Sequence, residues 1–114
     1  MKDCVFCRII EGSIPAQRIY EDEKTIVIRD INPVAPVHLL VIPKTHIEGL
    51  NELTAEQADI SHAILMAARK AAGLTGIDED GYRLVNNCGE KAGQTVMHLH
   101  FHVLGGTEMR ELKI

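Results

Sequence analysis

The segment His98–Leu104 constrains the fold most, because polar and apolar residues alternate from His98 to Val103. This period of two is typical of a β-strand with one buried face. It places His98, His100 and His102 on one face of the strand and apolar side chains on the other. The first and third histidines lie about 13 Å apart along such a strand. One regular strand therefore cannot bring all three to one metal, and we expect them to have different roles.

A solvated edge strand would also present polar residues on one face. Here a glycine-rich polar segment precedes the histidines, and Gly105-Gly106 follows them. Glycines allow the backbone to approach a ligand closely. We therefore interpret the histidine face as a functional site.

The length of 114 residues fits one domain spanning residues 1–114. The net charge of −4, without a basic run, argues against nucleic acid and membrane surfaces as partners. Small phosphates remain possible, because backbone amides and histidines can bind them. The start of the chain does not resemble a signal peptide, and no apolar run approaches the roughly 18 residues of a membrane span. We expect a cytoplasmic protein.

Two of the three cysteines, Cys4 and Cys7, are too close together for the framework disulfide of a secreted domain. The pair begins a short helical segment that Gly12-Ser13 ends. A C-x-x-C pair is half of a zinc site, which histidines would have to complete. The alternative is two small buried hydrophobic residues beside Phe6.

The chain predicts an α+β fold with an antiparallel sheet of about five strands. Besides the histidine strand, the β-rich segments are a hairpin of residues 18–21 and 25–29, an almost wholly apolar strand at 37–42, and residues 82–86. Thr54 and Gln57 form a capping box that opens the long helix, residues 54–74. We expect this helix and the short N-terminal one to cover one side of the sheet.

The segment Ala63–Ala68 is apolar nearly all round, which is more than a helix with one buried face requires. We infer a second burial surface on the long helix. The simplest such surface is the interface of a homodimer.

The central histidine, His100, is the predicted nucleophile toward phosphorus, because neutral imidazole attacks well and leaves well. The neighbouring His102 would act toward the leaving group. Donors to the phosphate should come from residues 87–95, where glycines alternate with polar side chains. A Walker loop is absent from the sequence, so nothing points to an ATP-driven machine.

The motif His-x-His-x-His followed by two apolar residues resembles the signature of the histidine triad (HIT) superfamily. The segments 6–15, 30–47 and 83–106 resemble its Hint branch. The resemblance implies a homodimer whose two sheets join into one. It also implies a nucleotide-binding phosphoramidase that acts on purine nucleoside 5′-phosphoramidates and related nucleotidyl amines or acyl adenylates, with AMP or GMP as product.

Carried over by position, the resemblance makes His100 the residue that forms the nucleotidyl intermediate. His102 would contact the phosphate and assist the leaving amine, and His38 would support both. Asp30 would bind the ribose hydroxyls. The other implied nucleotide-binding residues are Phe6, Ile9, Ile14, Ile28 and Ile31 around the base, and Asn87, Gly93, Gln94 and Thr95 around the α-phosphate. Each apolar residue could equally be ordinary core.

Superfamily members that keep the C-x-x-C pair also resemble this chain in having a histidine after Pro-Lys-x. The resemblance therefore implies one structural zinc per chain, bound by Cys4, Cys7, His46 and His98, that catalysis does not require. His62 and Cys88 receive no role.

Two alternatives stay open beside the phosphoramidase: a dinucleoside polyphosphate hydrolase of the same superfamily, and a zinc-stabilised nucleotide-binding interaction module. The nucleotidyl transferases of the superfamily generally carry glutamine where His102 stands, so the third histidine argues for water as the acceptor. Residues 111–114 lack the aromatic tail of some Hint proteins, so the resemblance does not define the leaving group. The sequence also does not define the choice between adenine and guanine.

Overall fold

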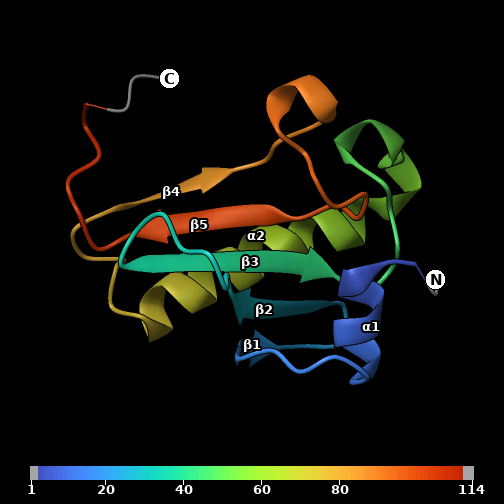
Figure 1. The fold of residues 1–114 in the computed structure, drawn as a ribbon, viewed down its shortest axis with the longest axis horizontal. Helices are drawn as coiled ribbons and strands as arrows, with labels where there is room; N and C mark the ends of the chain where they lie inside the picture. The colour runs from blue at the N-terminus through green and yellow to red at the C-terminus, as the bar shows by residue number, and fades with distance from the viewer. Residues whose placement is uncertain (1–2, 112–114) are drawn as a thin grey trace.

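A computed structural model describes residues 3–111 and has a five-stranded antiparallel sheet in the order β1-β2-β3-β5-β4 (Figure 1). This confirms the predicted α+β class. The C-terminal segment 112–114, which bears on the predicted lack of an aromatic tail, lies outside the described residues. The helices and strands are α1 (Val5–Glu11), β1 (Arg18–Glu21), β2 (Thr25–Arg29), β3 (Val37–Pro43), α2 (Ala58–Leu74), β4 (Tyr82–Val85) and β5 (Phe101–Gly105). Short 3₁₀ turns η1 (Leu50–Glu52), η2 (Ala55–Gln57) and η3 (Glu90–Ala92) connect them.

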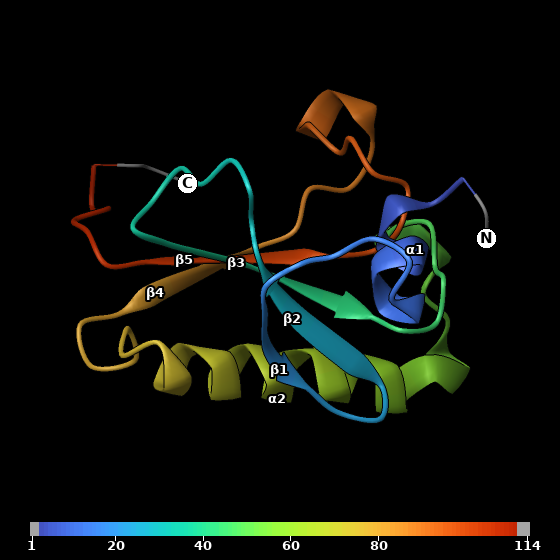
Figure 2. The same ribbon diagram turned by 60° about the horizontal axis from the view of Figure 1, so that its bottom comes forward.

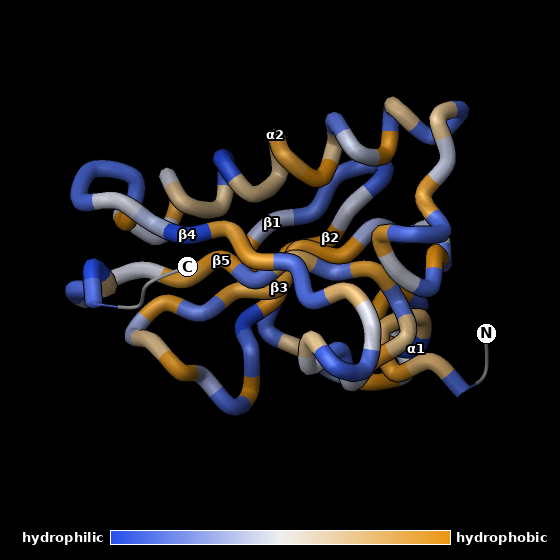
Figure 3. The backbone as a smooth tube through the Cα atoms, turned by 90° about the horizontal axis from the view of Figure 1, so that it is seen from above, coloured by the Kyte–Doolittle hydropathy of each residue, from blue (hydrophilic) through white to orange (hydrophobic). Residues whose placement is uncertain are grey.

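The central strand β3 separates two hydrophobic clusters. On one face, Leu39 and Val41 pack in the cluster that contains the buried side of α2. On the other face, Leu40 and Ile42 pack with residues of α1. The prediction that both helices lie on one side of the sheet was therefore wrong, because a strand buried on both faces requires cover on both. Hydrophobic positions run along the central strands β2, β3 and β5 (Figure 3).

The residues predicted to end the short helix and to begin the long one make the expected hydrogen bonds. Gly12 ends α1 in the left-handed region at φ 90°, and its amide bonds to carbonyls of the last turn. The side-chain carbonyl of Gln57 accepts from the Thr54 amide at 2.9 Å, just before α2. On α2, Leu65 and Met66 are exposed. None of the helices between residues 3 and 111 is long and apolar enough to cross a membrane.

The histidine strand is shorter than predicted, because β5 begins only at Phe101. The ladder between β3 and β5 ends at the Val41–Phe101 pair. Two positions further along this register, Leu99 would face Pro43, which has no N–H to donate. The Pro43 carbonyl bonds instead to the ring Nε2 of His98, at 2.8 Å. Residues 98–100 therefore leave the sheet while keeping its alternation, with Leu99 fully buried in the cluster beside α2.

We expect Gly105→Ala to destabilise the fold by about 1–3 kcal/mol, as overpacked cores do. A Cβ at Gly105 would lie 2.8 to 3.0 Å from three atoms of the Ile77 side chain. Urea unfolding would measure the loss. The double variant Gly105→Ala/Ile77→Ala should show positive coupling, since the smaller side chain makes room. Strictly additive losses would contradict this explanation.

Candidate functional site

His38 and His102 meet on the face of the sheet opposite α2. In the antiparallel register Leu40 pairs with His102, and paired residues share a face. His38 lies two residues before Leu40, so it projects to the same side. Figure 2 shows α2 beneath the sheet, with the connection 30–36 and the turn around η3 on the other side. The site therefore lies under these two loops.

The hydrogen bonds of His38 define which nitrogens carry protons. Its Nδ1 accepts from the Val34 amide at 3.1 Å, so the ring proton lies on Nε2. That Nε2 is 2.8 Å from Nδ1 of His102 and 3.3 Å from a carboxylate oxygen of Asp30. His38 therefore donates to His102, which leaves the proton of His102 on its Nε2. His102 thus presents a donor on the side away from His38.

The same argument gives the opposite tautomer for His100. Its Nδ1 lies 2.7 Å from the carbonyl oxygen of His98 and must donate to it. The Nε2 of the neutral ring is then unprotonated and free to act as a nucleophile. The rings of His100 and His102 are neighbours, with centroids 5.3 Å apart. A ring with an unprotonated Nε2 and a ring with an Nε2–H donor are therefore neighbours.

Burial favours the neutral forms of His38 and His102. Desolvation lowers the pKa of His38, although the Asp30 carboxylate opposes the shift. Desolvation also lowers the pKa of His102, and the rings of His100 and His38 add to the effect. At neutral pH the tautomers assigned to His38 and His102 therefore describe the free protein.

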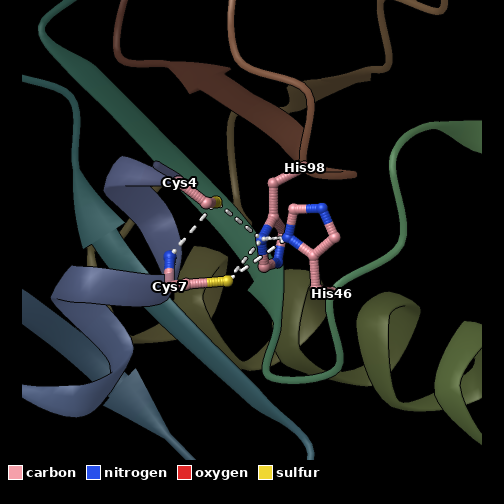
Figure 4. Close-up of side chains that lie close together, drawn as sticks. All are labelled: Cys4, Cys7, His46 and His98. Carbon is pink, nitrogen blue, oxygen red and sulfur yellow. Dashed lines mark hydrogen bonds between the residues drawn. The ribbon is translucent and has the colours of Figure 1, made fainter. Parts of the chain in front are cut away.

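The four predicted zinc ligands converge on one point (Figure 4). Nδ1 of His98 lies 3.2 Å from Sγ of Cys4 and 3.5 Å from Sγ of Cys7. Nδ1 of His46 lies 3.3 Å from the Cys7 sulfur and 3.1 Å from Nδ1 of His98. All four ligand atoms are within 4.8 Å of one another.

These distances fit a tetrahedral metal. Zinc bonds of usual length place neighbouring ligand atoms about 3.3 to 3.8 Å apart, which is close to the spacing here. His98 also has the correct tautomer, since its Nε2 donates to the Pro43 carbonyl and leaves Nδ1 unprotonated. The Cys7 amide approaches the Cys4 sulfur at 3.3 Å, as amides do beside metal thiolates. The donor set of two thiols and two imidazoles suits zinc and leaves no open position.

A second cluster between residues 3 and 111, formed by Asp30, His38 and His102, also brings three ligand atoms within 4.8 Å. Its hydrogen bonds argue against a metal there. A metal on Nε2 of His38 would require a proton on Nδ1, where the Val34 amide already donates. These hydrogen bonds therefore suit the exchange of protons better than a metal, and the cysteine cluster is the one whose donors fit a metal.

Comparison with known proteins agrees with this geometry. A model of the HIT domain matches residues 11–109. The chain belongs to the HIT family. A HIT family hydrolase from Clostridium thermocellum has a similar structure, with TM-score 0.94 and 53% identity over 96% of this chain and 95% of that one. A histidine triad protein from Clostridium difficile gives TM-score 0.91 and 42% identity, covering 95% and 94%.

A curated relative in the HIT family has a more specific name. The purine nucleoside phosphoramidase of Escherichia coli is 40% identical over 105 residues, which is 92% of this chain and 88% of that protein.

The loop before the triad of this HIT domain is braced by Gln94. Its side-chain oxygen accepts from the Gly89 amide at 2.9 Å, and its nitrogen donates to the carbonyls of Glu48 and Val96. The Gln94 side chain is thus engaged within the protein. Of the other residues predicted to bind phosphate, Asn87 is half-buried, while Gly93, at φ 92°, and Thr95 are exposed.

The residues predicted to line the base pocket separate into two groups. Phe6, Ile9 and Ile28 are buried together in the cluster on the α1 face, and Ile14 packs against it. Ile31 is instead 90% exposed, beside the half-buried Asp30. The first group forms a wall behind the histidines, and Ile31 has its whole side chain available at the rim.

Sequence reasoning missed three groups that hold the triad. Asn86 donates from Nδ2 to the His100 carbonyl at 2.9 Å. The Val34 amide and the Pro43 carbonyl hold His38 and His98. The only sequence signal was an asparagine directly after the β4 segment. Backbone groups leave no signal of that kind.

We expect the free energy of unfolding to fall as the pH drops from about 6.5 toward 4. Burial lowers the pKa of His98 to about 4, and burial lowers those of His38 and His102 as well. The unfolded chain therefore binds protons in this window before the native state does, which favours unfolding. Melting temperatures between pH 7 and pH 4 would test this. His62→Gln, on the exposed face of α2, should melt with the same pH profile, and a flat wild-type profile would contradict the prediction.

Proposed function

We propose that this HIT-family protein is a nucleotide hydrolase that cleaves the P–N bond of purine nucleoside 5′-phosphoramidates through a nucleotidyl-histidine intermediate. The observation that carries the proposal is the pair of opposite tautomers. His100 has an unprotonated Nε2, and the adjacent His102 has a protonated one. This is the combination that a nucleophile and a proton donor require.

In the first step, Nε2 of His100 attacks phosphorus and the bond to the amine nitrogen breaks. The carbonyl of His98 holds the ring through Nδ1 as it becomes positively charged. Binding of the phosphate favours the protonated form of His102, which takes up one proton from solvent. His102 then donates its Nε2 proton to the departing nitrogen and is left neutral, with the remaining proton in the hydrogen bond to His38. Asp30, 3.3 Å from His38, offsets the positive charge of the His38–His102 pair.

In the second step, water attacks phosphorus and the bond to His100 breaks. The neutral His102 accepts a proton from this water. The nucleoside monophosphate leaves, His102 releases its additional proton to solvent, and both rings return to their starting forms. Glutamine could hold a phosphate oxygen but could not exchange these protons, so the third histidine supports water as the acceptor.

Recognition of the nucleotide would divide among three surfaces. The ribose hydroxyls would bond to the Asp30 carboxylate, a suitable acceptor for a diol. Asn87, Gly93 and Thr95 would face the α-phosphate, and Gln94 would hold their loop in place through its three contacts. The base would lie against Ile31 and the wall formed by Phe6, Ile9, Ile14 and Ile28.

Zinc would be held by Cys4, Cys7, His46 and His98. When bound, it supplies structural cross-linking between α1 and the segments before α2 and β5, and no chemistry on the substrate. The site would be closed, since protein ligands would take all four positions.

We further propose a homodimer. Leu65 and Met66 on α2 are 51% and 42% exposed, and β4 is an edge strand of the sheet. Pairing of two such edges would join the sheets and cover α2. Light scattering should give twice the chain mass of 12.6 kDa. Leu65→Lys should shift the mass toward that of one chain, and a monomeric wild type would contradict the proposal.

The test of the function is a steady-state assay with adenosine 5′-phosphoramidate beside diadenosine polyphosphate, with and without a chelator. We expect the phosphoramidate to be hydrolysed in both conditions, because brief chelation leaves a closed zinc site loaded. Preference for the polyphosphate would reassign the substrate. If neither substrate turns over while AMP binds, the protein is a nucleotide-binding interaction module.

A further inference from the structure

We propose that the metal cluster positions the nucleophile, because His98 is both a ligand of the metal and the residue whose carbonyl holds His100 in its attacking tautomer. The inference rests on the proposed function. By this inference, a bound metal affects the turnover rate although it does not contact the substrate. His98 is then a positioning residue.

The side chain of His98 is held at both ring nitrogens, and the backbone carbonyl of His98 holds the ring of His100. The His98 side chain is fully buried, with Nδ1 in the cysteine cluster and Nε2 bonded to the Pro43 carbonyl. Its own carbonyl accepts from Nδ1 of His100 at 2.7 Å. One residue therefore connects the metal site to the reacting ring.

The backbone at His98 depends on these anchors because the sheet does not hold it. The ladder to β3 ends at the Val41–Phe101 pair, three residues further along. The nearest backbone bond in this stretch runs from the Leu99 amide to the Ile47 carbonyl, at 2.6 Å. Ile47 directly follows the metal ligand His46. Two of the three supports of the segment 98–99 therefore start from the metal cluster or its neighbour, and the third is the bond from Nε2 of His98 to the Pro43 carbonyl.

Phe6 gives a second connection between the two sites. It lies on α1 between the ligands Cys4 and Cys7. Its ring packs edge-on against His98 and His100, with centroid distances of 5.9 and 5.0 Å. A metal that ties both cysteines to His98 also fixes this ring against the nucleophile.

Loss of the metal should therefore affect turnover more than binding. The groups proposed to bind ribose and phosphate, Asp30 and residues 87–95, belong to other loops. The ring of His100 would lose its fixed acceptor and could adopt the other tautomer, with the proton on Nε2. Displacements of about 1 Å at a reacting group cost on the order of 100-fold. We expect kcat to fall about 10- to 100-fold. The affinity for AMP should fall less, because Asp30 and residues 87–95 keep their places and only the part of the base wall on α1 is tied to the metal.

The experiment compares zinc-loaded wild type with Cys7→Ala, measuring zinc content, kcat, KM and AMP affinity. Nitrogen NMR of the histidine rings reports the His100 tautomer independently of activity. Cys7→His, which keeps four ligands, should restore zinc, tautomer and kcat. Ile64→Ala is the matched control, since this residue is 1% exposed in the core beside α2. It should lower the melting temperature while leaving kcat unchanged below that temperature.

The proposal is supported if Cys7→Ala loses zinc, the Nδ1–H tautomer of His100 and kcat together, while AMP still binds. It is overturned if zinc is lost and both the tautomer and kcat persist, because the metal then only stabilises the fold. If Cys7→Ala does not fold, the same NMR comparison of wild type before and after exhaustive chelation decides between these results. If wild type hydrolyses no phosphoramidate, the proposed function fails, and the tautomer measurement still tests the coupling.

Discussion

We expect His100→Ala to lower hydrolysis of adenosine 5′-phosphoramidate by at least about 10⁴-fold, as loss of a nucleophile does in other covalent enzymes. The reason is that Nε2 of His100 is the unprotonated nitrogen beside the donor of His102. Steady-state kinetics with the zinc-loaded protein would measure the loss. Wild type quenched during turnover should carry a nucleotidyl group, and the variant should carry none.

Binding and folding must be separated from chemistry in this variant. His100 is 7% exposed and packs on Phe6, so alanine leaves a small cavity. AMP should still bind, and circular dichroism should match wild type. The exposed His62→Ala should keep full activity. A folded His100→Ala protein that keeps more than about a tenth of the wild-type rate would rule out His100 as the nucleophile. Such a small loss of rate is far below the loss expected on removal of a nucleophile.

The sheet could be predicted because its signals are local. The alternation around the triad, the charged turn between β1 and β2, and the apolar run of β3 each depend on neighbouring residues. The apolar run also implied cover on both faces, which conflicts with the prediction that both helices lie on one side. The short helix α1 resolves this conflict by packing Phe6 and Ile9 on the second face.

The details of the site could not be predicted because they depend on backbone groups and long-range contacts. Nothing local indicates that the segment before Phe101 leaves the sheet, since the cause is Pro43, more than fifty residues earlier. Gln94 shows the same limit. Its side chain suggested a phosphate ligand, yet the fold brings three backbone groups to it. Asn86 holds the His100 carbonyl through a pairing that only the β4–β5 register creates.

The other large effect should come from His102→Gln, and it should depend on the leaving group. Glutamine can still donate a hydrogen bond but cannot transfer a proton at neutral pH. For an alkylamine phosphoramidate, whose nitrogen must leave protonated, we expect the rate to fall about 10²- to 10⁴-fold, the usual contribution of a general acid. For the nitrophenyl ester of AMP, whose leaving group is stable as an anion, the fall should stay below about 10-fold.

The comparison of the two substrates distinguishes loss of the general acid in His102→Gln from misplacement of the phosphate. Misplacement of the phosphate would slow both substrates equally, whereas loss of the acid slows only the amine. The same substitution at the exposed His62 should leave both rates unchanged. Equal losses of rate for the two substrates would assign His102 to phosphate binding. The hydrogen bond from His38 to His102, at 2.8 Å, would then orient the His102 ring without a role in acid catalysis.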